Sequence, residues 1–147
     1  MHPIRLPHDA IGWLMLVCGV LTFTMVSALI APDWALREAF GDTVTEPLAL
    51  AIVRSWGALV ALVGAFTIVG ALRPQWRTPA LAISAVSKAV FVAVMLTSAS
   101  AAQIDAAAVV LLIDTAWALL FGGALLRELR QWARASAYMR VDVHRAV

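Results

Sequence analysis

Residues 47–72 read PLALAIVRSWGALVALVGAFTIVGAL, the longest apolar segment of the chain. Only one charged side chain, Arg54, interrupts these 26 residues. The hydrocarbon core of a bilayer is about 30 Å thick, and roughly 20 apolar residues in a helix cross it. The segment therefore predicts a membrane-spanning helix.

Three more segments have the same character, at residues 11–30, 78–102 and 106–126. The first has no charged residue, the second has only Lys88, and the third has only Asp114. These runs are long and unbroken, whereas a membrane strand has about ten residues of alternating polarity. We expect an all-α protein in which residues 1–147 form one membrane domain with four transmembrane helices.

The composition agrees with this class. Of 147 residues, 63% are hydrophobic and 14% are charged, and the mean hydropathy is +0.89. Soluble domains are nearer half apolar and a quarter charged, so these values argue against a soluble enzyme. The net charge of +2 is too small for a polycation, so no nucleic-acid partner is expected. A lone cysteine, Cys18, cannot form an internal disulfide.

The charges outside the spans predict the orientation. One side would carry Arg37 with five acidic residues, Asp33, Glu38, Asp42, Glu46 and Asp105. The other side would carry eight arginines, Arg5, Arg73, Arg77, Arg127, Arg130, Arg134, Arg140 and Arg145. Because basic loops remain in the cytoplasm during insertion, both termini are expected inside, in a bacterial-type inner membrane.

Two segments outside the spans are expected to be helical. Residues 32–40 predict a short outer amphipathic helix that begins at Pro32 and stops at Gly41. The tail, residues 127–147, predicts a basic helix with an apolar face formed by Leu129, Trp132, Ala133 and Met139. This helix would either rest on an anionic inner leaflet or extend into solvent as a fraying tail.

Arg54, Lys88 and Asp114 lie inside predicted spans. One such residue at the centre of a helix costs about 2.5–3.5 kcal/mol on insertion. Counted along the helices at a rise of ~1.5 Å per residue, all three fall within about 5 Å of one depth in the outer half. Lipid offers them no partner, so we expect them to face one another in a buried polar layer.

Nearby side chains could complete this layer. Ser84 lies one turn from Lys88, Trp117 shares the face of Asp114, and Trp56 has the depth to stack on a cation. Two cations and one anion leave an excess charge. A neutral Lys88, an approach by Glu46 or a bound anion or polar headgroup would resolve it. The layer could equally serve only to hold the helices in register.

No residue pattern indicates catalysis or a metal. The three histidines, His2, His8 and His144, lie outside the spans, which argues against an intramembrane haem. Neither metal-ligand spacing nor a phosphate-binding loop is present in the sequence. We expect no metal, no cofactor and no catalytic residue.

Residues 31–41, APDWALREAFG, and 53–81, VRSWGALVALVGAFTIVGALRPQWRTPAL, resemble small four-helix membrane proteins of the DoxX-like superfamily, in particular its DUF4345 and BphX-like branches. The matching positions are Pro32 and Phe40-Gly41 in the outer loop, Arg54 with Gly57 and Gly64, and the basic turn that contains Arg73 and Arg77. It implies a membrane subunit of a quinone-linked oxidoreductase, an assembly chaperone or a binder of hydrophobic small molecules.

The expected function is therefore non-catalytic: an accessory subunit, or a binder of a quinone or lipid whose head group meets the polar layer. Such a protein would act with membrane lipid and with a membrane protein partner or a second copy of itself. One alternative is a small oligomeric transporter or proton relay in which Asp114 titrates. Another is an enzyme acting on a lipid-like substrate.

Overall fold

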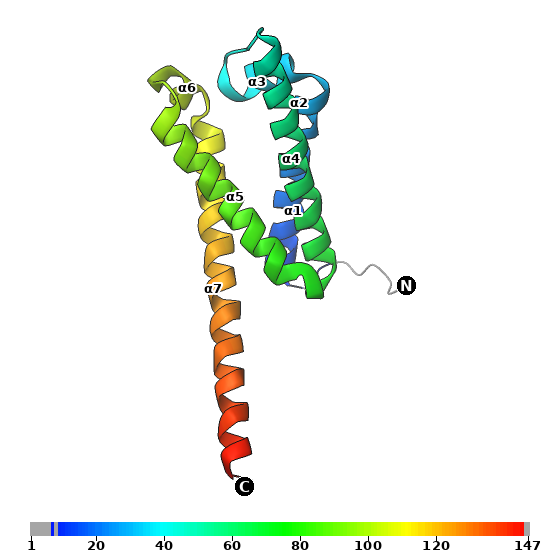
Figure 1. Ribbon diagram of the computed structural model, residues 1–147, viewed down its shortest axis with the longest axis vertical. Coiled ribbons are helices and arrows are strands. Elements are labelled where there is room, and N and C mark those ends of the chain that lie inside the picture. The colour runs from blue at the N-terminus through cyan, green and yellow to red at the C-terminus, as the bar shows by residue number, and fades with distance from the viewer. Residues whose placement is uncertain (1–6, 8, 146–147) are drawn as a thin grey trace.

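The computed structural model describes residues 7 and 9–145, with side chains up to Gln131 and at Ala133. In this part of the chain, helices follow one another through short connections and no β-strand occurs (Figure 1). Four helical segments are long and apolar enough to cross a membrane: Ala10–Ile30, Pro47–Leu72, Pro74–Ser98 and Ala108–Gln131. The protein is therefore all-α with four candidate spans, as the sequence predicts.

The first span is bent, which the sequence analysis did not anticipate. It consists of α1 (Ala10–Phe23) and α2 (Val26–Ile30). At the junction, the Thr24 hydroxyl donates a 2.6 Å hydrogen bond to the Leu21 carbonyl, and the Met25 amide bonds to the carbonyl of Thr22, three residues back. This tighter local bonding interrupts the α-helix without a proline or glycine.

The outer helix α3 (Pro32–Phe40) has the predicted bounds. Pro32 occupies its first turn, and Gly41 ends it with φ 69°. A left-handed conformation of this kind strains side chains other than glycine, so Gly41 stops the helix for a conformational reason.

The second span, α4 (Pro47–Leu72), also matches its prediction. The Glu46 side chain accepts a 3.2 Å hydrogen bond from the Ala49 amide at its start. At its end, Arg73 has an extended conformation because it precedes Pro74. A 3₁₀ turn, η1 (Pro74–Trp76), leads directly into the third span, α5 (Arg77–Ser98).

The third span ends earlier than the predicted residue 102. Ser100 and Gln103 form a reciprocal capping box that starts a separate short helix, α6 (Ala101–Ala106). The last helix, α7 (Ala108–Arg145), then runs without a break through the fourth span and into the tail. Its 38 residues correspond to about 57 Å. The tail continues straight from the fourth span (Figure 1). Trp132 and Met139 of its predicted apolar face lie outside the residues whose side chains the structure describes.

The helices pack as two pairs joined through α5. The first span packs along α4, and α7 packs along α5, which also contacts α4. Close approach of α1 to α4 depends on Gly64, where an added Cβ would lie 2.5 Å from the Phe23 amide nitrogen and 2.8 Å from the Gly19 carbonyl oxygen. Small residues permit such backbone contact between membrane helices.

We name the two ends of the bundle by their charges. The basic end contains η1 and the start of α5, with Arg73, Arg77 and Arg127. The acidic end contains α3 and α6, with Asp33, Glu38, Asp42 and Asp105. From the turn at the basic end, α5 runs diagonally away from α4 towards the start of α7 (Figure 1).

The buried apolar cluster joins α1, α4, α5 and α7, and consists of Met15, Cys18, Ala71, Ala80, Leu81, Phe121 and Ala124. Large apolar side chains face outward elsewhere. Ile30, Leu112 and Leu119 are 74%, 72% and 72% exposed. A lipid-facing surface accounts for this exposure, which would be unusually extensive for a protein in water.

Candidate functional site

Lys88 is buried on α5, at 9% residue exposure. Its Nζ donates a 2.5 Å hydrogen bond to Oδ1 of Asp114 on α7, forming an ion pair. The two side chains are 11% and 17% exposed. The expected contact between charges from separate spans is therefore present for this pair, and it holds α5 against α7.

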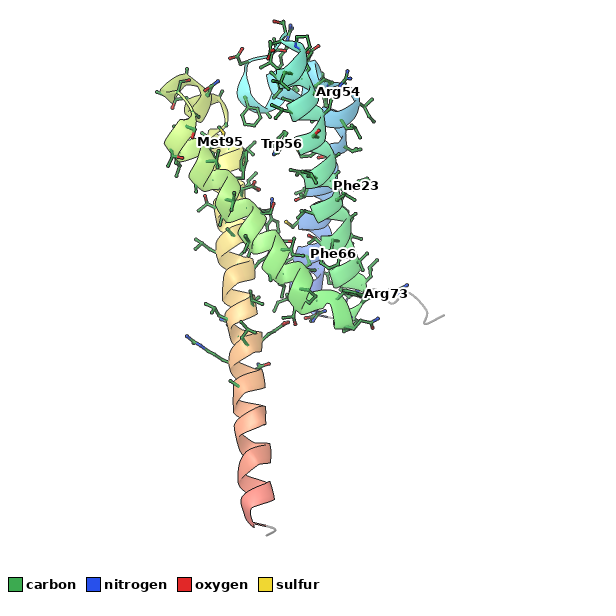
Figure 2. The ribbon with its side chains drawn as sticks, viewed as in Figure 1. Phe23, Arg54, Trp56, Phe66, Arg73 and Met95 are labelled. Atoms are coloured by element: carbon green, nitrogen blue, oxygen red, sulfur yellow. The ribbon has the colours of Figure 1, made fainter. Side chains whose placement is uncertain are left out.

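Arg54 lies apart from this pair, so the predicted three-charge layer is wrong in that respect. Its side chain is exposed, and no described residue forms an ion pair with it. Arg54 lies one turn before Gly57, whose added Cβ would meet Ala28 and the Leu29 amide of α2. Trp56 is on the opposite side of α4, towards α5 (Figure 2). Arg54 therefore lies on the α2 side of α4, away from the pair.

Ser84 bonds to a residue that the sequence analysis did not single out. Its hydroxyl lies 2.5 Å from the Thr67 hydroxyl of α4, and both residues are buried. The Thr67 hydroxyl donates to the Val63 carbonyl at 2.7 Å, so the proton between the two hydroxyls comes from Ser84. Thr67 precedes the η1 turn by about as many residues as Ser84 follows it. This spacing in the sequence could have predicted their contact.

Trp56 stacks on aromatic rings and not on a cation, contrary to its predicted role. Its ring centroid is 6.4 Å from Phe91 at an interplanar angle of 23°, and 6.3 Å from Phe40. Phe40 and Phe91 are 6.4 Å apart. This aromatic cluster, Phe40, Trp56 and Phe91, joins α3, α4 and α5 about one turn of α5 beyond Lys88.

Trp117 lies on α7, three residues after Asp114. Its ring centroid is 5.4 Å from that of Phe121, and the side chain packs against the buried apolar cluster. The Asp114 carboxylate bonds to Lys88 and not to the Trp117 indole. Trp117 therefore serves in packing beside the ion pair.

A cavity of about 200 Å³ lies at the acidic end, between α3 with its following loop and α5 with α6. Its lining residues are Leu36, Phe40, Asp42, Thr43, Val44, Met95, Ala99 and Gln103. Four of them have large apolar side chains, which we call the apolar wall. Three have polar side chains, Asp42, Thr43 and Gln103, which we call the polar rim. We call this space the acidic-end cavity.

Some polar groups of the rim already form hydrogen bonds within the protein. The Thr43 hydroxyl donates to Oδ1 of Asp33 at 3.1 Å, and Oε1 of Gln103 accepts from the Ser100 amide at 3.0 Å. The Nε2 group of Gln103 donates no hydrogen bond to a described residue, so it can serve a ligand.

The ion pair and the acidic-end cavity are separate features. Neither Lys88 nor Asp114 lines the cavity, and the aromatic cluster lies between them through Phe40 and Phe91. Among the residues that could be searched, no three His, Cys, Asp or Glu side chains converge as metal ligands.

Comparisons with protein-family models, curated proteins and solved structures find no match to this chain.

Proposed function

We propose that this protein is a non-catalytic membrane subunit that binds a small ring compound with polar substituents, such as a quinone head group, in the acidic-end cavity. The observation that carries the proposal is the cavity itself, with its apolar wall and polar rim. A closed apolar cavity of about 150 Å³ can hold benzene, whereas this space is partly open to the outside. At about 200 Å³, this cavity suits one substituted ring and not a complete drug-sized molecule.

The lining matches the chemistry of a quinone. Leu36, Phe40 and Met95 offer apolar contact to the ring and its alkyl substituents. The free amide group of Gln103 can donate a hydrogen bond to a ring carbonyl. The aromatic cluster beneath would keep the ring near the acidic end.

In this proposal the ion pair has a structural role. It fixes α5 on α7, so that α5 contributes one wall of the acidic-end cavity and α3 contributes the opposite wall. We also propose that the chain belongs to the DoxX-like superfamily. Residues 31–41 and 53–81 support this part of the proposal. A partner oxidoreductase in the membrane would make the protein an accessory subunit.

The test is binding of a short-chain ubiquinone to the purified protein in nanodiscs, measured by equilibrium dialysis. Ala99→Phe places a ring in the cavity just after the end of α5, whereas Ala93→Phe places one on the exposed surface of α5 itself. We expect the first variant to weaken binding by about tenfold or more, equivalent to about 1.4 kcal/mol, and the second to leave it unchanged.

A second comparison tests the polar contact. Gln103→Glu keeps an oxygen for the Ser100 capping box but removes the amide donor. Weaker ubiquinone binding by this variant supports the proposed bond. Equal binding by wild type, Ala99→Phe and Gln103→Glu would contradict the assignment of the cavity.

A proton relay is the second candidate, favoured by the burial of a titratable carboxylate within the spans. It predicts proton flux in liposomes that Asp114→Asn abolishes and Asp105→Asn, at the acidic end, leaves unchanged.

A further inference from the structure

A second groove, at the basic end, lies between α1 and α7 and has a volume of about 350 Å³. It is lined by Ile11 and Leu14 of α1 and, among others, by Leu119, Gly123 and Arg127 of α7. Every lining residue except Arg127 is apolar. We call this feature the basic-end groove.

The groove is open because α1 and α7 belong to different helix pairs. The helix α1 packs along α4 and α7 packs along α5, so no extensive contact joins α1 to α7 in the described part of the chain. An added Cβ at Gly123 would meet no atom within 4 Å. Within a membrane span, such an apolar space has to be filled by hydrocarbon, because water there has no polar partners.

Arg127 gives the groove a charged mouth. Its side chain is exposed, and it forms no ion pair with a described residue. Arg77, another arginine at this end, is already held by two bonds of 2.8 and 2.9 Å to the Asp9 carboxylate. A guanidinium group binds phosphate through two parallel hydrogen bonds, so Arg127 complements an anionic headgroup.

The length of the groove and the position of Arg127 indicate how a lipid would lie in it. From Leu119 to Arg127 the groove follows α7 for about 12 Å, with the arginine at the end nearer the basic surface. A lipid lying along α7 would therefore put its phosphate at Arg127 and its chain beside Gly123 and Leu119.

We propose that the basic-end groove binds one acyl chain of an anionic phospholipid, and that Arg127 binds the phosphate of the same molecule. This site is independent of the acidic-end cavity. It lies in the leaflet that contacts the basic end, where anionic lipids are attracted to juxtamembrane arginines.

The experiment is native mass spectrometry of the protein released from nanodiscs that contain equal amounts of phosphatidylglycerol and phosphatidylcholine. Gly123→Leu fills the groove, and Gly122→Leu is its matched control, because an added Cβ at Gly122 also meets open space but Gly122 does not line the groove. Arg127→Gln removes the phosphate contact, and Arg130→Gln removes an exposed arginine that does not line the groove.

We expect the wild-type protein to retain one phosphatidylglycerol in preference to phosphatidylcholine. Gly123→Leu should reduce its retention by about tenfold, as should Arg127→Gln, on the scale of one charge-assisted contact. The two control variants should behave as wild type. Since Arg127 is exposed, its variant tests the proposal even if Gly123→Leu does not fold.

Three results would overturn the proposal. One is equal retention of the two lipids by the wild-type protein, and another is undiminished phosphatidylglycerol in both test variants. The third is a dimeric mass that Gly123→Leu converts to a monomer, which would assign the groove to a second copy of the chain.

Discussion

Lys88 is a buried ammonium group inside a candidate membrane span, and one carboxylate stabilises its charge there. Charges buried without a partner are costly in protein and more so in hydrocarbon. The 2.5 Å contact with Asp114 supplies that partner. The pair therefore stabilises the protein most relative to a variant that keeps only one of the two charges. Relative to a variant with two apolar side chains, its contribution to stability is smaller.

This comparison yields a prediction for single and double variants. Asp114→Asn leaves the Lys88 charge buried and should lower the free energy of unfolding by about 3 kcal/mol. The double variant Lys88→Met, Asp114→Leu should recover most of the loss, because no charge remains buried. Reversible unfolding in mixed micelles measures both changes.

Asp105→Asn is the control, since this carboxylate is exposed at the acidic end and should alter stability little. If the double variant is no more stable than Asp114→Asn, the loss does not come from an unpaired lysine.

Residue spacing could predict only part of this site. Counting along the spans places Lys88 and Asp114 at one depth, and their contact follows because lipid offers no alternative. The same count places Arg54 beside them, yet the direction of a side chain around its helix depends on which neighbours pack there. Packing of α2 against the Gly57 side of α4 turns Arg54 away from α5, and depth alone holds no information about this.

At the scale of elements, Phe40 joins α3 to α4 and α5, while Pro32 and Ala35 of the same helix are buried. The Phe40 side chain contacts one aromatic ring on α4 and one on α5, and it also lines the acidic-end cavity. Trp34, on the same helix, is 59% exposed. Attachment of α3 therefore depends more on Phe40 than on Trp34.

We predict that Phe40→Ala loosens α3, with a loss of about 1–3 kcal/mol of packing that includes the two aromatic contacts. Hydrogen exchange of the α3 amides should then accelerate, while the exchange of α4 amides remains slow. Trp34→Ala should have little effect on either helix. Equal acceleration in the two variants would show that Phe40 does not hold α3.

The bounds of the elements were predictable where proline or glycine marks them. Pro32, Gly41, Pro47 and Pro74 define the ends of α3 and α4 for conformational reasons. The bend at Thr24 comes from a side-chain hydrogen bond, which an apolar run does not reveal. The continuity of α7 has the opposite origin, since no proline or glycine lies between its Gly123 and Arg145 to stop the helix.

At the scale of the whole molecule, the two ends differ in charge, which predicts the orientation in the membrane. The basic end holds η1 and the acidic end holds α3. Positively charged loops remain in the cytoplasm during insertion. We therefore predict that η1 is cytoplasmic and α3 is outside, in a bacterial inner membrane.

Single-cysteine labelling measures this orientation. Cys18 is buried at 2% exposure and is first replaced in Cys18→Ser. In intact spheroplasts, an impermeant maleimide should then label the Glu38→Cys variant and spare the Gln75→Cys variant. Detergent should allow labelling of both, and the reversed pattern before detergent would mean the opposite orientation.

The length of α7 has a mechanical consequence. It is about 57 Å long, nearly twice the ~30 Å core of a bilayer. Its extensive contacts are with α5 alone in the described chain, so the free portion acts as a lever arm. A force on its distal end would produce a torque about the contacts near Glu128, whose Oε2 accepts a 2.6 Å hydrogen bond from the Thr78 hydroxyl of α5.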